Sequence, residues 1–337
     1  MKCVTGARRL ARSRLISSVL ERQRRLSTVS DTSKPALVSV VVVTYNSARH
    51  IASCLESLAG NERLMSVVVV DNASTDATAE IIGSKIPSMP WPVNFIHTGV
   101  NLGFGRAVNR GVASLPMANQ YVCILNPDTV VGVAALDRLA SYLDTHQHVA
   151  LVGPRVQNPD GSTYASVRSF PNPLVALGHA FGGILWPNNP VSRRYRSTDP
   201  ESPDWVSGTV MMVRRDAFEQ VSGFDERYFM YVEDLDLCWR LRAAGWQIGF
   251  CSLAEVTHEI GGSGIDSRRR LVIEHHRSAW QFAKASSTGT KRVLLPFYGL
   301  ALLGRLTLVM LGSWVGRRYG GPGQPSCRVN RNEGPLD

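Results

Sequence analysis

Apolar runs that end in polar residues alternate with stretches of helical spacing along roughly the first 130 residues. The runs rich in Val and Ile predict strands over 37–46, 66–75, 95–99 and 121–129, and the stretches between them predict helices over 47–59, 76–83 and 103–115. Uninterrupted β-branched runs are typical of strands buried on both faces of a parallel sheet. Repeated strand–helix–strand units therefore predict an α/β fold with a mostly parallel, doubly wound sheet, whose ligands bind at the carboxyl ends of the strands.

The regularity of this pattern fades after about residue 150. Residues 156–204 are rich in Pro, Asn, Ser and Arg and are expected to form loops over the sheet. A strand followed by a helix is expected over 206–218, a loop leading into a helix over 223–246, and a further strand over 247–251.

An apolar stretch near the carboxyl terminus, 293–316, holds one charged residue in 24 positions. Its length permits a membrane-spanning helix. Pro296 near its start and Arg305 at its centre argue against one, because a central charge costs about 2.5–3.5 kcal/mol even on the gentler insertion scale. A helix or hairpin in the membrane interface, with Arg305 snorkelling, is favoured, while a spanning helix and a soluble core helix remain open.

The formal net charge of +10 is confined to the two ends of the chain. Residues 1–35 carry nine Lys/Arg and two acidic residues, and residues 291–337 carry seven and two, which leaves 21 basic and 23 acidic residues in 36–290. Basic ends on a nearly neutral body suit an anionic membrane surface better than nucleic acid, which is not expected as a partner. We expect a basic N-terminal extension (1–35), a catalytic domain (36–290) and a membrane-associating segment (291–337).

The N-terminal extension is rich in Arg and Ser, poor in acidic residues and roughly amphipathic. That is the composition of a mitochondrial transit peptide. A basic surface helix, or a start codon assigned too early, would explain it equally well.

Polar residues that could bind a nucleotide follow the first two predicted strands. Thr44, Tyr45 and Asn46 follow the first, and Asp71 ends the second. An Asp at the end of a parallel strand commonly accepts a hydrogen bond from a nucleotide. It could equally cap the next helix.

The segment NLGFGRAVNRG (101–111) places glycines at the start of a predicted helix. Gly103 and Gly105 allow close backbone approach, and Arg106 and Asn109 lie on one helical face. A glycine-rich helix start suits a diphosphate. The GxGxxG spacing is absent and the segment follows the third strand, which disfavours a Rossmann dehydrogenase.

The segment LNPDT (125–129) places Asp128 just past a strand of buried type. An unpaired carboxylate is costly to desolvate there. A hard divalent cation that bridges Asp128 and a diphosphate would explain its position. Asn, Pro and Asp are also ordinary turn formers, so the motif alone does not establish a metal site.

Seven segments together resemble glycosyltransferase family 2, and more closely its bacterial rhamnosyltransferase-like branch. They are, over about residues 37–285, VVVVTYN, VVVVDNASTD, NLGFGRAVNRG, LNPDT, WVSGTVMMVRRDAF, GFDERYFMYVEDLDLCWRLRAAGW and VTHEIGGSG. Each motif is weak alone, but seven in order with the family's spacing are specific. The resemblance implies a GT-A fold, in which a nucleotide-binding parallel sheet merges with a smaller acceptor-binding half.

The same resemblance implies roles for individual residues. Nucleotide-sugar binding falls to Thr44, Tyr45, Asn46, Asp71, Asn72, Asn101, Gly103, Arg106, Asn109 and Asn126. The NPD segment matches the family's DxD metal motif with Asn126 in place of the first Asp, so ligation of Mg²⁺ or Mn²⁺ rests chiefly on Asp128. His258 would approach the metal or diphosphate from the far side, unless it is an ordinary loop histidine. Trp205, Ser207 and Gly208 would line the acceptor side, although Trp205 could equally be a core residue.

The segment VEDLD (232–236) matches the family's ED motif, in which an acid removes the proton of the acceptor hydroxyl. Asp236 is expected to pair with Arg240, four residues on. Glu233 and Asp234 lie at the junction of loop and helix, where backbone amides favour ionised carboxylates. The family match places the base at the second acid, so Asp234 is the expected base and Glu233 the alternative.

These features predict an inverting, metal-dependent glycosyltransferase that moves a sugar from a nucleotide-diphosphate donor to a glycan or lipid-linked glycan in surface polysaccharide assembly. Deoxythymidine-diphospho-rhamnose is the expected donor by resemblance only, and another sugar is the alternative. The basic, apolar ends would hold the enzyme at the cytoplasmic face of the cell membrane. A nucleotidyltransferase would have no use for the ED and WVSG motifs. An inactive glycan-binding homologue would have lost Asp128 or the ED pair, which are both present.

Overall fold

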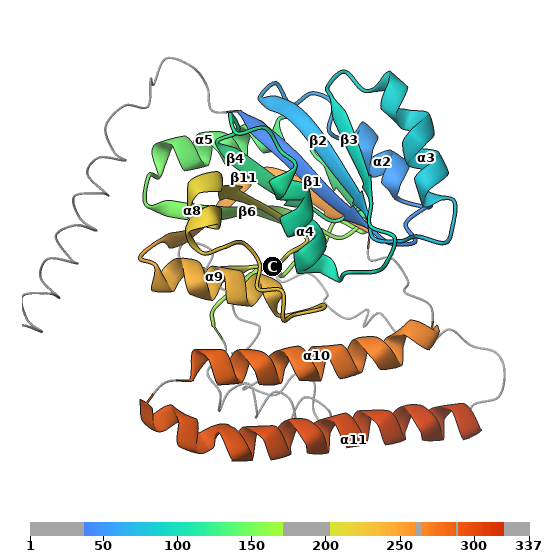
Figure 1. Ribbon diagram of the computed structural model, residues 1–337, viewed down its shortest axis with the longest axis vertical. Coiled ribbons are helices and arrows are strands. Elements are labelled where there is room, and N and C mark those ends of the chain that lie inside the picture. The colour runs from blue at the N-terminus through green and yellow to red at the C-terminus, as the bar shows by residue number, and fades with distance from the viewer. Residues whose placement is uncertain (1–36, 171–202, 260–264, 288, 320–337) are drawn as a thin grey trace, which may run out of the picture. The chain divides into compact units, whose positions relative to one another are not determined.

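The computed structural model describes residues 37–170, 203–259, 265–287 and 289–319 (Figure 1). The strands are β1 (Val38–Thr44), β2 (Leu64–Asp71), β3 (Val93–His97), β4 (Tyr121–Leu125), β5 (Thr129–Val131), β6 (Val149–Gln157), β7 (Thr163–Tyr164), β8 (Val167–Arg168), β9 (Trp205–Val206), β10 (Val210–Arg214) and β11 (Gln247–His258). Within the described part, nine strands form one sheet in the order β3-β2-β1-β4-β10-β6-β11-β5, with β7 beside β6, and β8 and β9 form a second sheet.

Helices flank the large sheet and extend beyond it (Figure 1). They are α2 (Ile51–Glu56), α3 (Thr78–Lys85), α4 (Phe104–Ala113), α5 (Ala135–Thr145), α8 (Arg215–Gln220), α9 (Glu233–Ala243), α10 (Ile265–Ser286) and α11 (Leu295–Tyr319), with short 3-10 helices η1 (Ile86–Ser88) and η2 (Gly289–Leu294). The sequence pattern predicts α2, α3, α4, α8, α9 and α11, with ends that differ by a few residues. It does not predict α5 or α10.

The amino-terminal part of the sheet is parallel and buried, as the sequence predicts. β1 pairs in parallel with β2 and β4, and β2 pairs in parallel with β3. All seven residues of β1 are buried. The register sets Thr44 opposite Asp71 and Asp71 opposite His97. Three strands therefore present their carboxyl ends at one edge of the sheet.

The second part of the sheet is mixed, and it is more regular than the sequence suggests. β10 runs antiparallel to β4 and β6, while β6 and β11 are parallel. The expectation that regular structure fades after residue 150 is therefore wrong for β6, which lies inside the sheet. Gly153 and Pro154 interrupt its apolar pattern, yet both are buried. A Cβ on Gly153 would lie 2.4 Å from Val206 Cγ1, so packing against β9 explains the glycine.

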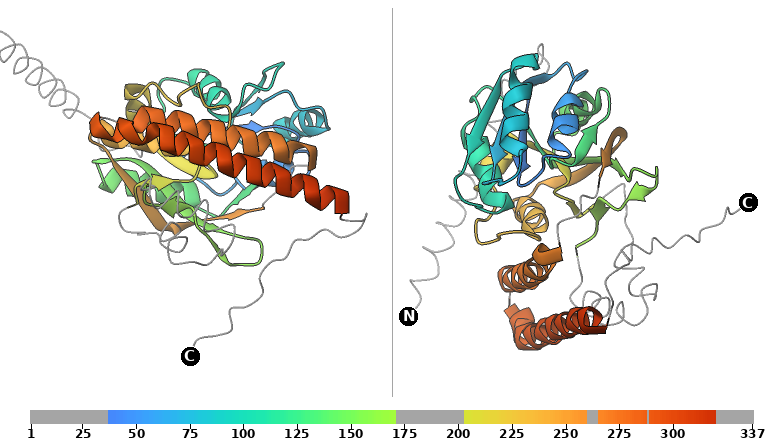
Figure 2. Two further views of the ribbon diagram at one scale, coloured as in Figure 1. Left: turned by 90° about the horizontal axis from the view of Figure 1, so that it is seen from below. Right: turned by 90° about the vertical axis from the view of Figure 1, so that its right-hand side faces the viewer.

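Helices α10 and α11 form an antiparallel hairpin (Figures 1 and 2). Residues Arg292–Leu311 have a mean hydropathy of 1.8 and are long and apolar enough to cross a membrane, and none of this stretch is buried. That exposure contradicts a soluble core helix. Arg305 also differs from expectation, because it turns towards α10 rather than snorkelling: its Nη1 lies 2.9 Å from Nε2 of His276. The N-terminal extension lies outside the described residues.

Candidate active site

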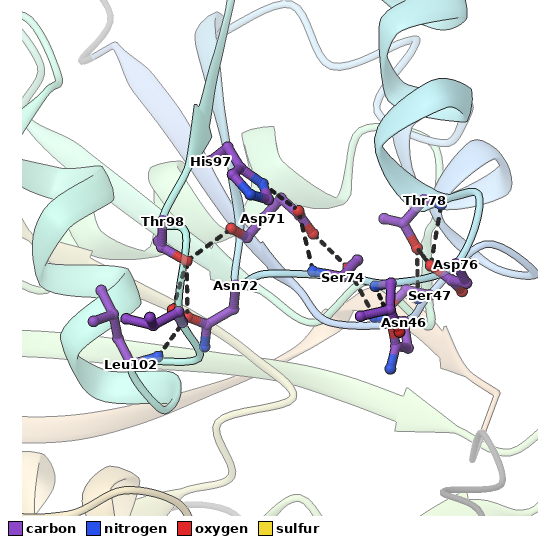
Figure 3. A network of polar contacts seen from close by, with 12 residues as sticks. Asn46, Ser47, Asp71, Asn72, Ser74, Asp76, Thr78, His97, Thr98 and Leu102 are labelled. Carbon is purple, nitrogen blue, oxygen red and sulfur yellow. Dashed lines mark hydrogen bonds and ion pairs between the residues drawn. The ribbon is translucent and has the colours of Figure 1, made fainter.

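The carboxylate of Asp71 is held at the end of β2 by surrounding donors (Figure 3). It is completely buried, and Ser74 donates to it from its backbone N–H (3.2 Å) and from its Oγ (2.5 Å). Nδ1 of His97, at the end of β3, lies 2.8 Å from Asp71 Oδ2. Helix α3 begins only at Thr78 and has no side-chain cap, so the helix-cap interpretation of Asp71 is wrong. Asp71 is instead a buried acceptor of fixed orientation.

The loop after β1 is tied to the loop after β2 through Asn46 (Figure 3). Asn46 has a left-handed φ of 51°, its N–H donates to Ser74 Oγ (2.9 Å), and its Oδ1 accepts from the Thr75 N–H (2.8 Å). Thr44 is buried with no hydrogen-bond partner for its Oγ1, and Tyr45 is 49% exposed. The loop therefore brings a rigid amide, a buried hydroxyl and an exposed ring to the sheet edge.

Asn72 fastens the loop before α4 to the end of β2. Its Nδ2 donates to Asn101 Oδ1 (3.0 Å) and to the Gly103 carbonyl (3.2 Å), while its Oδ1 accepts from the Leu102 N–H (2.8 Å). Asn101 Oδ1 also accepts from the Gly103 N–H (3.0 Å). Both asparagines therefore shape the glycine loop, and direct contact with a nucleotide stays a prediction for each.

Gly103 stands where no other residue fits. Its φ is 84°, and a Cβ there would lie 2.2 Å from the carbonyl oxygen of Phe229. The same oxygen accepts a hydrogen bond from the Phe104 N–H (3.0 Å). The start of α4 is thereby joined to the loop that leads into α9, rather than left open on all sides.

Arg106 and Asn109 contact that same loop. Arg106 Nε donates to the Glu226 carbonyl (3.0 Å), and the Asn109 amide donates to the Phe224 carbonyl and accepts from its N–H (both 2.9 Å). The sequence assigns both residues to the nucleotide. The structure shows both residues anchoring the loop, and direct contact with a nucleotide stays a prediction for each.

Asp128 and His258 lie side by side because β5 pairs with β11, which sets Thr129 opposite His258. His258 Nε2 lies 3.3 Å from Asp128 Oδ1. Asp128 Oδ1 and His258 Nδ1 are buried and have no hydrogen-bond partner among the described residues. The Asn126 N–H donates to the Thr209 carbonyl (3.0 Å), which ties the NPD turn to β10.

A carboxylate oxygen and an imidazole nitrogen are a suitable pair of ligands for a divalent cation such as Mn²⁺. Among the residues that the structure describes, no group of three His, Cys, Asp or Glu side chains could enclose a metal. A cation at Asp128 and His258 would therefore complete its shell with oxygens of a diphosphate and water. The orphaned Asp128 oxygen fits that arrangement.

Glu233 and Asp234 occupy the first turn of α9, at the junction of loop and helix where the sequence places them. Asp234 accepts from two backbone N–H groups: Gly208 donates to its Oδ2 and Leu235 to its Oδ1, both at 2.8 Å. Glu233 is buried, and in the part of the chain that the structure describes its Oε2 has no hydrogen-bond partner. The structure thus joins the WVSG and ED motifs, which lie 26 residues apart.

Burial raises the pKa of both acids. The pKa of Glu233 rises to about 8, first because of burial and then because of the negative charge of Asp234. Burial also raises the pKa of Asp234, although the N–H groups of Gly208 and Leu235 oppose that rise. The expectation that backbone amides keep both acids readily ionised is therefore wrong, since desolvation outweighs them. Glu233 is protonated at neutral pH.

The third acid of the segment behaves as predicted. Arg240 Nε donates to Asp236 Oδ2 at 2.6 Å. Tyr228 Oη also donates to this carboxylate, at 3.2 Å. Asp236 thus holds the helix and the loop together. Glu233 and Asp234 remain as the candidate bases.

Trp205 and Ser207 lie on the strand and loop that precede β10. Trp205 Nε1 donates to the Ser169 carbonyl (3.2 Å), and the Arg168 guanidinium lies 5.6 Å from the ring centroid. Ser207 Oγ lies 3.0 Å from Thr209 Oγ1. The Trp205 ring also packs against the hydrophobic core, so both a core role and an acceptor role remain compatible with its position.

Sequence reasoning missed His97 and Ser74 as parts of the site. Ser74 lies within the segment VVVVDNASTD, and the segment FIHTG ends the third strand in a histidine. That position was a usable signal, because the carboxyl ends of adjacent parallel strands meet at one edge. The tie between Gly208 and Asp234 left no comparable signal in the sequence.

Comparisons with known proteins agree with this architecture. The sequence profile of glycosyl transferase family 2 matches residues 39–222, and a profile described as the N-terminal domain of galactosyltransferase matches residues 191–260. Among solved structures, mannosyltransferase PcManGT from Pyrobaculum calidifontis, in complex with GDP-Man and Mn²⁺, aligns with a TM-score of 0.53 at 17% identity, covering 90% of this chain and 88% of that one. GalNAc-T7 with UDP, GalNAc and Mn²⁺ aligns with a TM-score of 0.56 at 16% identity, covering 87% and 59%. The predicted GT-A-like fold is confirmed.

Several relatives match at the level of sequence, and two of them are named as rhamnosyltransferases. The chain is 38% identical over 274 residues to N-acetylglucosaminyl-diphospho-decaprenol L-rhamnosyltransferase of Mycobacterium tuberculosis, covering 77% of this chain and 88% of the relative. It is 28% identical over 228 residues to rhamnosyltransferase WbbL of Escherichia coli, covering 66% and 83%. Profile and identity together show that the chain is an enzyme of glycosyl transferase family 2.

Proposed function

We propose that the protein transfers rhamnose from a nucleotide-diphosphate donor to N-acetylglucosamine carried on a polyprenyl diphosphate. The main support is the 38% identity to the mycobacterial protein named for that reaction, which extends over most of both chains. The three carboxylates that such a transfer needs, Asp71, Asp128 and Asp234, belong to separate elements of the fold. Each has a distinct environment that suits a distinct role.

Asp71 would bind the nucleoside of the donor. Oδ2 accepts from the Ser74 N–H and from His97, and Oδ1 accepts from Ser74 Oγ, which leaves one lone pair on Oδ1 for a ring N–H or a ribose hydroxyl. Because the carboxylate is buried and fixed, little conformational freedom is lost when the donor binds.

Asp128 and His258 would hold Mg²⁺ or Mn²⁺ against the donor's diphosphate. When bound, the cation supplies positive charge that stabilises the leaving diphosphate. His258 contributes a nitrogen from the last position of β11, and Asp128 a carboxylate from the NPD turn. Thr129, paired with His258 across the two strands, keeps the two ligands together.

Asp234 would accept the proton of the acceptor hydroxyl. The hydroxyl oxygen then forms a bond to the anomeric carbon from the face opposite the diphosphate, which leaves with the electrons of the broken bond. The configuration at that carbon is inverted. Gly208 and Leu235 hold the Asp234 carboxylate in place. Protonated Glu233 beside it keeps a second negative charge away from Asp234, which favours the ionised form of the base.

The carboxyl-terminal helix would keep the enzyme at the membrane that carries its acceptor. Seven large apolar residues of η2 and α11 are exposed: Val293, Leu294, Phe297, Leu300, Leu303, Leu308 and Leu311. Exposed apolar side chains of this kind on one helix suit a helix that lies in the membrane interface.

Nucleoside-diphosphate release and product formation by the full-length protein test the proposal. The protein is incubated with Mg²⁺ or Mn²⁺, an N-acetylglucosaminyl-diphospho-lipid and a panel of nucleotide sugars. We expect transfer from deoxythymidine-diphospho-rhamnose. A clear preference for another sugar would overturn the donor assignment, and no transfer from any donor by folded protein would overturn the proposed function.

A further inference from the structure

Arg305 is a cation in an apolar helix, and no acidic partner for it lies among the residues that the structure describes. Its Nη1 lies 2.9 Å from His276 Nε2, and His276 Nδ1 lies 2.7 Å from the Val272 carbonyl. A carbonyl can only accept, so Nδ1 carries the ring proton and Nε2 accepts from Arg305. Burial and the charge of Arg305 lower the pKa of His276, which keeps the ring neutral. The positive charge of Arg305 is therefore not compensated by this contact.

A further donor of Arg305 is unpaired. Within the described part of the chain, its Nε is buried without a hydrogen-bond partner. Among the described side chains, none of the ion pairs within 4.0 Å involves Arg305. A guanidinium has five N–H donors in a planar fork that matches phosphate oxygens. The Arg305 side chain is half-buried, and a charged group with a buried, unpaired donor is costly unless an anion completes it.

This cation is linked to the catalytic acids by a short series of contacts. The Tyr231 ring, two residues before Glu233, lies edge-on to His275 with centroids 5.7 Å apart, and His275 precedes His276. Ser278 Oγ donates to the Met230 carbonyl (3.0 Å), which fixes α10 against the same loop. Contacts through α10 thus connect Arg305 of α11 with the loop that leads into α9.

We propose that Arg305, presented by His276, binds the diphosphate of the lipid-linked acceptor. This inference rests on the proposed function, because it assigns the anionic part of that acceptor a site between the sugar and the lipid. The acceptor's sugar would reach Asp234, its diphosphate would complete the donors of Arg305, and its lipid would follow the exposed leucines of α11. A free nucleotide donor would not use this site, which lies on the carboxyl-terminal hairpin.

Two acceptors separate this role from general membrane attraction. One is an N-acetylglucosaminyl-diphospho-lipid, and the other is an uncharged N-acetylglucosaminide with the same lipid. For Arg305→Gln in the full chain we expect the KM for the diphosphate acceptor to rise about 10- to 100-fold, the usual worth of charged hydrogen bonds to phosphate. The KM for the uncharged acceptor and for the donor should change less than about twofold. Arg277→Gln, an exposed arginine on α10, is the matched control and should behave as wild type.

Arg305→Lys keeps the charge without the planar fork, so it should give a smaller rise in the KM for the diphosphate acceptor. This variant also keeps the proposal testable if Arg305→Gln does not fold. Binding of each variant to phosphatidylglycerol vesicles forms the second arm. Equal KM values for wild type and Arg305→Gln would overturn the site. Equal loss of vesicle binding and of both acceptors in Arg305→Gln and Arg277→Gln would assign the charge to bulk lipid instead. If wild type uses neither acceptor, the proposed function itself fails.

Discussion

Replacing Glu233 by Gln tests the protonation state that burial imposes beside the catalytic base. The pKa of Glu233 is raised from 4.5 to about 8 in the folded protein. Between those values the folded protein holds a proton that the unfolded chain has released. The contribution of this group to stability is therefore full below about pH 4.5 and is lost as pH rises towards 8, by about 1.4 kcal/mol per pH unit.

Glutamine resembles the protonated acid and does not titrate. Between pH 6 and pH 8, wild type should lose about 2 kcal/mol of unfolding free energy relative to Glu233→Gln, since the slope levels off near the folded pKa. Urea denaturation at pH 6, 7 and 8 measures the difference. Glu80→Gln, an exposed glutamate in the first turn of α3, is the control and should follow wild type. Parallel pH profiles for wild type and Glu233→Gln would refute the reasoning.

Three further predictions concern the metal, the glycine loop and the membrane. Asp128→Asn should lower cation-dependent turnover about 100-fold or more with little change in melting temperature, and full activity in excess chelator would contradict the metal role. Gly103→Ala should destabilise by at least about 2 kcal/mol in denaturant titrations, because its Cβ meets a carbonyl at 2.2 Å, whereas Gly99→Ala, with φ of 75° and open space, should cost about 1 kcal/mol. Removing 291–337 should move the protein from the membrane fraction to the soluble one while donor hydrolysis persists, and a full-length protein soluble without lipid would contradict this.

The sequence predicts the parallel part of the sheet well because its strands are continuous Val runs, such as that of β1, that leave little ambiguity. It predicts β6 poorly because Gly153 is required by close packing with β9, a contact between residues distant in the chain, and Pro154 interrupts the apolar pattern. It misses α10 because this helix has no continuous apolar stripe of its own and depends on α11 and the 229–231 loop for burial.

In the candidate site, too, the sequence predicts some features and misses others. Family motifs locate Asp71, Asp128, His258 and the ED acids, and the structure brings Asp128 and His258 within 3.3 Å. Motifs do not reveal that Asn109 anchors a loop, since an Asn on a helix face has no sequence mark that distinguishes the two uses. The raised pKa values of the acids likewise depend on burial by the whole fold, which no local pattern contains.

Transfer of rhamnose to the lipid-linked acceptor by wild type and by Asp234→Asn, in the presence of Mn²⁺, tests the central claim most directly. The product's anomeric configuration and the rate are measured together, with donor affinity as the control. We predict an inverted linkage for wild type, a rate about 10²- to 10⁴-fold lower for Asp234→Asn, and nearly unchanged donor binding. A retained configuration, or near-normal transfer by Asp234→Asn while Glu233→Gln is inactive, would contradict the account.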